Sequence, residues 1–128
     1  MTLTATILKQ DLKQFCGTDR YYYDPLFKNI NYTDGFRYFM HNAGEGAHWF
    51  LILVATEIRP ILEEDFYFIE LLVNADETAK ITVQRDIGEP VLYEKELNYT
   101  DCPPSDEPYK FYFDCNKDIS ILFLPSEY

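Results

Sequence analysis

Basic residues are scarce in this 128-residue sequence, in which 11 lysines and arginines stand against 22 aspartates and glutamates. The formal net charge is therefore −11 at pH 7. Such a balance argues against a protein that holds nucleic acid or an anionic membrane through a basic face. It leaves open a basic partner, or a surface that imitates nucleic acid.

Long hydrophobic runs are also missing. The longest apolar run, Trp49 to Ala55, is too short to span a bilayer. The opening residues, MTLTATILKQDLKQ, lack the basic segment and apolar core of a secretory signal. The three cysteines, Cys16, Cys102 and Cys115, are an odd number with no closely spaced pair. We therefore expect a cytoplasmic protein whose three thiols are free.

Motifs for catalysis, phosphate binding and metal binding are absent from the sequence as well. It contains neither a Gly-x-Ser-x-Gly elbow nor a Gly-Lys-Ser/Thr phosphate loop. Glycines interrupt the segment between its two histidines, His41 and His48, and a metal site usually needs three or four protein ligands. The sequence therefore predicts no enzyme activity, no metal and no cofactor.

The residues that are present suffice for one buried core. Aliphatic, aromatic and cysteine residues make up 47% of the chain, which predicts a single domain over residues 1–128. The charge divides unevenly: residues 1–64 hold 8 acids and 6 bases, net −2, whereas residues 65–128 hold 14 acids and 5 bases, net −9. An acidic surface is therefore expected in the second half.

The first half, residues 1–62, has the spacing of amphipathic helices. Thr4 or Thr6 is expected to cap a first helix that ends at Gly17, and Thr33-Asp34 to begin a second that ends at Gly44. The apolar faces of these helices are Leu8, Leu12 and Phe15, and Phe36, Phe39 and Met40. Residues 47–62 are expected to form a buried helix that ends near Pro60. Tyr21 to Tyr23, before a proline, are expected in an extended loop, with their rings either packed or exposed as anchors for a partner.

The second half, residues 66–124, changes to the period of two that is typical of strands. Five strands are predicted, over residues 66–73, 80–85, 91–99, 109–115 and 119–124. Because their connections are short, we expect an antiparallel meander. The predicted fold is α+β, with the N-terminal helices packed on one face of a five-stranded antiparallel meander sheet.

Alternation along these strands predicts an acidic outer face. If Val91, Tyr93, Leu97 and Tyr99 face the core, Glu94 and Glu96 face outward. The residues expected to contact a partner are Glu94, Glu96, Asp101, Asp106, Glu107, Tyr112, Asp114, Tyr21 and Tyr22. A solvated sheet face and a docking surface for a Lys/Arg-rich groove both fit this pattern.

Several fragments resemble a known family. They are Phe15-Cys16-Gly17-Thr18, Tyr32-Thr33-Asp34-Gly35, Tyr38, Ala43-Gly44, His48-Trp49 and Leu124-Pro125-Ser126-Glu127-Tyr128. Together they are similar to an uncharacterised family, a domain of unknown function in small proteins of phages, plasmids and cyanobacterial replicons. The resemblance implies a mobile-element origin and a cytoplasmic setting, and it implies no activity.

These observations lead to one main hypothesis and two alternatives. The main hypothesis is a non-enzymatic inhibitor of a host nucleic-acid-handling defence complex, in the manner of an anti-CRISPR protein. Its acidic face would occupy the basic groove of a nucleic-acid-binding host protein or ribonucleoprotein. The first alternative is a sponge or enzyme for a small nucleotide, with a pocket between helices and sheet near Tyr21 to Tyr23, Arg37 and Trp49. The second is a structural accessory protein.

Overall fold

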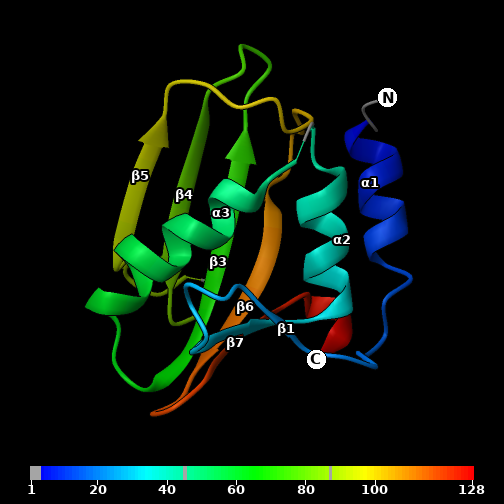
Figure 1. Cartoon of the computed structure of the whole chain (residues 1–128). Coiled ribbons are helices and arrows are strands. Elements are labelled where there is room, and N and C mark those ends of the chain that lie inside the picture. The colour runs from blue at the N-terminus through cyan, green and yellow to red at the C-terminus, as the bar shows by residue number, and fades with distance from the viewer. Residues whose placement is uncertain (1–3, 45, 87) are drawn as a thin grey trace.

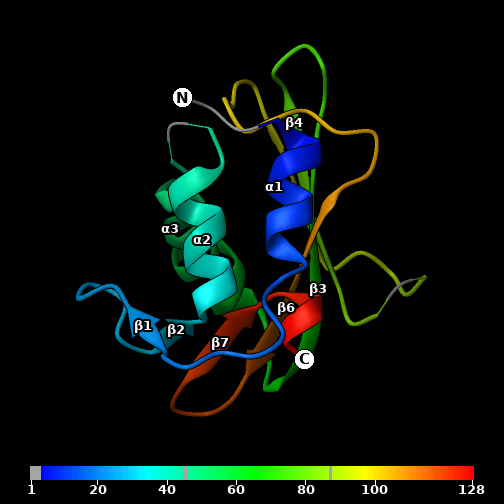
Figure 2. The same cartoon turned by 90° about the vertical axis from the view of Figure 1, so that its right-hand side faces the viewer.

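Three α-helices cover one face of a seven-stranded mixed sheet in the computed structural model, which describes residues 4–44, 46–86 and 88–128 (Figures 1 and 2). The predicted α+β class is confirmed. Within those ranges, none of the helices combines the length and the apolar character that a bilayer crossing requires.

The first two helices begin at the threonines that the sequence suggests as caps. Helix α1 (Ala5–Leu12) follows Thr4, whose side-chain oxygen accepts a hydrogen bond from the backbone N–H of Ile7. Helix α2 (Asp34–Asn42) follows Thr33, which caps the N–H of Phe36 in the same way. These bonds satisfy amide groups that the helix itself leaves unpaired. Gly44 follows α2 with a φ of +66°, a conformation that favours glycine.

The third helical segment changes its geometry along its length. Helix α3 (His48–Leu53) continues into a π-helical turn, η1 (Val54–Ile58), and a 3₁₀ turn, η2 (Arg59–Ile61). Pro60 lies in the last turn and has no amide hydrogen to extend an α-helix. The predicted buried helix near Pro60 is therefore confirmed in position but is not a regular α-helix.

The predicted five-stranded meander is wrong. The strands are β1 (Tyr22–Tyr23), β2 (Ile30–Tyr32), β3 (Asp65–Val73), β4 (Ala79–Gln84), β5 (Tyr93–Leu97), β6 (Tyr109–Cys115) and β7 (Ser120–Phe123). Their order in the sheet is β1-β2-β7-β6-β3-β4-β5, and β2 pairs with β7 in parallel. Two short strands thus come from the half that was predicted to be helical.

The other error concerns the partner of β6. Strand β6 pairs with β3 and not with β5, because residues 98–108 carry the chain back across the β3–β4 turn. Along this path the N–H of Thr100 donates to the carbonyl of Glu77, and that of Ser105 to the carbonyl of Val73. Strand β3 is largely apolar and needs a neighbour on both edges, so it occupies the interior of the sheet.

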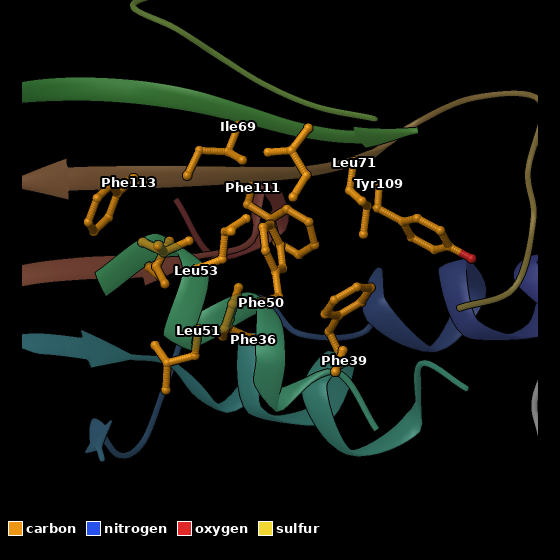
Figure 3. Packing of buried hydrophobic residues seen from close by; sticks show 14 of the residues in the cluster. Phe36, Phe39, Phe50, Leu51, Leu53, Ile69, Leu71, Tyr109, Phe111 and Phe113 are labelled. Carbon is orange, nitrogen blue, oxygen red and sulfur yellow. The ribbon is translucent and has the colours of Figure 1, made fainter. Parts of the chain in front are cut away.

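The core lies between the helices and the inner face of the sheet. Phe36, Phe39 and Phe50 point from the helices toward Phe111 on β6, with ring centroids 4.8 to 5.4 Å from that of Phe111 (Figure 3). Edge-on contacts of this kind add to the stabilisation from burial.

The predicted inward and outward faces are correct on β4. The strand predicted over residues 91–99 is longer than the observed β5. Ile81 and Val83 are fully buried, while Thr82 and Gln84 lie on the outer face. Val91 and Tyr99, however, are 48% and 67% exposed and do not face the core as predicted. They lie outside β5, which covers Tyr93–Leu97 alone.

Candidate interaction surface

Five acidic residues lie on two adjoining loops at one end of the sheet, which we call the acidic end. They are Asp76, Glu77, Asp101, Asp106 and Glu107, from the β3–β4 turn and the β5–β6 loop. The hydrogen bonds from Thr100 and Ser105 to the β3–β4 hairpin hold these two segments together. Figure 1 shows both at the end of the sheet where β5 finishes. The acidic end contains three of the residues predicted from sequence: Asp101, Asp106 and Glu107.

Lys9 reaches this end from α1, and Lys13 and Lys110 lie near it. Lys9 Nζ donates to Ser105 Oγ at 2.6 Å and to the carbonyl of Glu107 at 2.7 Å, and lies 5.0 Å from the centroid of the Tyr109 ring. Burial lowers the pKa of this amine, despite the nearby Glu107. These lysines do not balance the five acidic residues, so the acidic end keeps a net negative charge.

Local structure orders the loops that carry the carboxylates. Asp76 accepts hydrogen bonds from the side chain and backbone of Thr78, which lower the pKa of Asp76 and keep it ionised. A Cβ atom at Gly44 would lie 2.5 Å from the carbonyl oxygen of Asp101, so only glycine allows this close approach of the loop to the end of α2. An open hollow of about 720 Å³ lies between α1 and these loops, lined by Lys9, Asn74, Ser105 and Asp106 among others.

Glu94 and Glu96 lie on the outer face of the edge strand β5 and are exposed. Glu94 forms an ion pair with Lys80 at 3.0 Å, and Glu96 lies opposite Lys80 in the register. The acid charge here is thus partly offset by a neighbouring strand. Charged side chains on an edge strand also protect it against pairing with another chain.

The helix-facing side of β5 is joined to η1. Lys95 Nζ donates to Glu57 at 2.9 Å, and the Tyr93 hydroxyl donates to the same carboxylate at 3.1 Å. The hydrogen bond from Lys95 is the main cause that lowers the pKa of Glu57. Burial, followed by the bond to Glu57, raises the pKa of Tyr93 to about 12.

Tyr112 and Asp114 lie on the outer face of β6, far from the edge strand. Two strands, β3 and β4, separate β6 from β5, a distance of about 14 Å at the usual strand spacing. The meander would have placed these residues beside Glu94 and Glu96. The structure therefore divides the predicted surface into two parts.

Tyr112 belongs to a group of four rings that we call the aromatic tetrad: Phe66, Tyr112, Phe123 and Tyr128. Every pair of these rings is in contact, with centroids between 5.1 and 6.2 Å apart. Beside the tetrad is a hollow of about 420 Å³, here called the tail hollow. It is lined by Thr18, Tyr21, Thr33, Phe66, Asp114, Ile121, Phe123, Glu127 and Tyr128. Tyr21 and Asp114, both predicted contact residues, thus meet in one place.

Tyr22 has a different role from its neighbours. Its ring stacks on Tyr32 at 5.7 Å and lies under the guanidinium of Arg37, and its hydroxyl donates to Asp34 at 2.9 Å. That hydrogen bond raises the pKa of Tyr22. Of the three consecutive tyrosines, Tyr22 is half-buried, while Tyr21 and Tyr23 are more than half exposed. Tyr21 is therefore more accessible to a partner than Tyr22 is.

The fragments that carry the family resemblance contact one another. Glu127 accepts hydrogen bonds from the Thr33 hydroxyl at 2.6 Å and from the N–H of Gly35 at 3.1 Å. Its charge therefore lies at the positive end of α2, where it is favourable. Thr18 accepts from the N–H of Asp34, whose carboxylate accepts in turn from the N–H of Asp19. This network fixes the C-terminal segment against the start of α2 and brings Tyr128 to the outer face of the sheet.

The first alternative requires a nucleotide pocket between the helices and the sheet, but side chains fill this layer. Phe36, Phe39, Phe50 and Phe111 occupy that layer (Figure 3). Arg37 lines an open hollow on the other side of α2, which neither Tyr21 nor Trp49 lines. In the part of the chain that the structure describes, no three His, Cys, Asp or Glu side chains gather as metal ligands would.

The fold and these surfaces define an acidic α+β protein with charged and aromatic groups displayed on one sheet face and one sheet end. Over residues 6–128 the chain matches a family of unknown function, DUF6876, and it belongs to that family. The predicted membership of an uncharacterised family is thus confirmed. No curated protein matches the chain at a significant level.

A crystal structure of a protein of unknown function from Enterococcus faecalis is similar to part of the fold. The two chains are 13% identical, with a TM-score of 0.42, over 63% of this chain and 74% of the other.

Proposed function

We propose that this protein is a non-enzymatic interaction module that binds a basic protein partner through its acidic end. The observation that carries the proposal is the presence of five acidic residues on two loops that are hydrogen-bonded to each other, where the amine of Lys9 is bound to Ser105 and to the carbonyl of Glu107. Groups of one sign steer a partner of opposite sign and exclude partners of like sign.

The fixed conformation of these loops supports binding as well. Glu77 lies at a φ of +70° in a closed turn, and its carbonyl accepts from Thr100. The backbone that carries the carboxylates is therefore held in place before any partner arrives, which lowers the entropy lost on association.

A finer version of the proposal names the class of partner. A groove that normally holds a nucleic-acid backbone presents rows of lysines and arginines, and carboxylates fit the positions of its phosphates. The net charge of −11 and the resemblance to proteins of mobile elements support a host nucleic-acid-handling complex as the partner and inhibition as the outcome. An anti-CRISPR protein would act in this way.

Charge reversal at the acidic end tests the proposal. The variant carries Glu77→Lys, Asp106→Lys and Glu107→Lys, and the matched control carries Glu64→Lys, Glu89→Lys and Asp118→Lys. All six positions are exposed, so both variants change the net charge equally and spare the core. The partner is captured from nuclease-treated host lysate, purified, and titrated against each protein at several salt concentrations.

We expect the acidic-end variant to bind roughly 100-fold more weakly, as reversed charges against a basic groove imply. The control should stay within about threefold of the original protein. Equal losses in both variants would mean that net charge alone matters, and unchanged binding by the acidic-end variant would refute the proposal. Competition with labelled nucleic acid for the same partner tests the finer version, which requires mutual exclusion.

A further inference from the structure

We propose that the tail hollow binds the guanidinium group of an arginine side chain from a protein partner. The site consists of the rings of Tyr21, Phe66, Phe123 and Tyr128 and the carboxylate of Asp114. It uses residues other than those of the acidic end and does not depend on the function proposed for that end.

The strand register brings the site together. Asp114 on β6 lies directly between Phe66 on β3 and Ile121 on β7, and all three face outward. Phe123 is the next outward residue on β7, and Tyr128 contacts Phe66 and Phe123 with centroid distances of 5.7 and 6.2 Å. A carboxylate is thus set directly among aromatic rings.

Asp114 is available to pair with a cation. The residue as a whole is of intermediate exposure, and within the described residues its carboxylate takes part in no hydrogen bond or ion pair. The other carboxylate of the hollow, Glu127, is already bound to Thr33 and to the start of α2.

The protein's own cations do not fill this position. Of the described residues that line the tail hollow, none is a lysine or an arginine. Arg85 lies on the far side of the tetrad, where it lines a separate hollow and faces Asp65 at 3.7 Å and Glu63 at 3.8 Å. Asp114 therefore remains for a cation supplied by another molecule.

Arginine fits this chemistry better than the other side chains do. Its planar guanidinium stacks on aromatic faces, as that of Arg37 does on Tyr22 in this same structure. It also donates two parallel hydrogen bonds to one carboxylate, which an ammonium group does not. Tyr21 and Tyr128 are 57% and 83% exposed, so their rings are free to enclose the incoming group.

The test is a titration of the full chain, labelled with ¹⁵N, with the capped tripeptide acetyl-Gly-Arg-Gly-amide. The control ligand contains citrulline, which has the shape of arginine without its charge. We expect saturable shifts of the amide signals of Phe66, Asp114, Ile121 and Phe123 with the arginine peptide, and at least fivefold weaker binding of the citrulline peptide.

Two variants locate the binding. Asp114→Asn keeps the shape of the side chain and should weaken binding roughly tenfold, and Tyr128→Leu, at an exposed position, should weaken it severalfold. Glu89→Gln, at an exposed position outside both surfaces, should leave it unchanged. Equal affinity for the two peptides, absence of saturable shifts, or an unaffected Asp114→Asn would each overturn the proposal. None of these results bears on the acidic end, because no captured partner enters the assay.

Discussion

Both faces of the sheet carry aromatic side chains, but most of those on the inner face are buried and most of those on the outer face are partly exposed. On the inner face, Phe111 and Phe113 are fully buried beneath the helices. On the outer face, the register places Phe123, Tyr112, Phe68 and Gln84 in one row across four strands. The next row, toward the acidic end, is Lys110, Glu70, Thr82 and Glu94. The outer face therefore passes from aromatic to charged along its strands, whereas the inner face is mostly apolar, with an exception at the edge strand β5, where Lys95 pairs with Glu57.

The inner face therefore mainly stabilises the fold, whereas the outer face has groups that are suited to contacts with other molecules. The helices exclude water from the inner face, and burial there provides the main stabilisation of the fold. No α-helix of the described chain covers the outer face, so its rings shield one another and Tyr128 stays largely in solvent. Aromatic side chains that are left in this position are typical of contact surfaces.

The largest effect should come from a substitution on the inner face. Phe111→Ala removes a ring that contacts Phe36, Phe39 and Phe50, so we expect a loss of about 3–5 kcal/mol in the free energy of unfolding. Tyr112→Ala, one residue along and on the outer face, should cost about 1–2 kcal/mol, because that ring is half-exposed. Urea denaturation of both variants measures the contrast, and equal losses would contradict it.

A smaller effect is expected where the C-terminal segment crosses to the outer face. A Cβ at Gly35 would lie 2.5 Å from Leu124 Cδ1 and 2.6 Å from Glu127 Oε1. Gly35→Ala should therefore displace Glu127 and Tyr128 and destabilise the protein by about 1–3 kcal/mol.

Gly17→Ala is the control for Gly35→Ala, since no described atom beyond its chain neighbours lies within 4 Å of a Cβ at that position. Its unfolding midpoint should be nearly unchanged. If Gly35→Ala is as stable as Gly17→Ala, the network around Glu127 does not fix the tail.

The smallest effect should come from the charged row of the outer face. Glu94→Gln breaks the ion pair with Lys80, both of whose side chains are more than 40% exposed. We expect a change below about 1 kcal/mol that vanishes in high salt, because water and ions screen such pairs. Thermal unfolding at low and high salt checks this, and a large change at both would show that the charged row supports the fold.

Part of the fold was accessible from sequence because it depends on local rules. A threonine directly before an amphipathic stretch, as at Thr4 and Thr33, is typical of a helix cap. The alternation around Ile81 and Val83 indicates which face of the strand is buried. Strand order depends on which edge a distant segment reaches. Nothing local in residues 98–108 shows that they cross back over the β3–β4 turn, so the partner of β6 could not be predicted. Strands β1 and β2, of two and three residues, are too short to show a period.

The candidate surfaces were predicted in part for the same reasons. The run of acids in one loop indicates Asp106 and Glu107, but their meeting with Asp76 and Glu77 follows from the strand order. The outward alternation of Phe66 and Phe68, and of Phe123, was a usable signal for the aromatic tetrad. The place of Tyr128 depends on the contact of Glu127 with α2, which joins the two ends of the sequence.

The most direct test of binding through the acidic end is carboxylate footprinting of the complex with the captured partner. Exposed carboxylates are coupled to glycine ethyl ester with a carbodiimide, and the labelled sites are quantified by mass spectrometry with and without the partner. We predict that the partner protects Glu77, Asp106 and Glu107, while Glu64, Glu89 and Asp118 are labelled equally in both samples. Protection of the second set without the first would contradict the account.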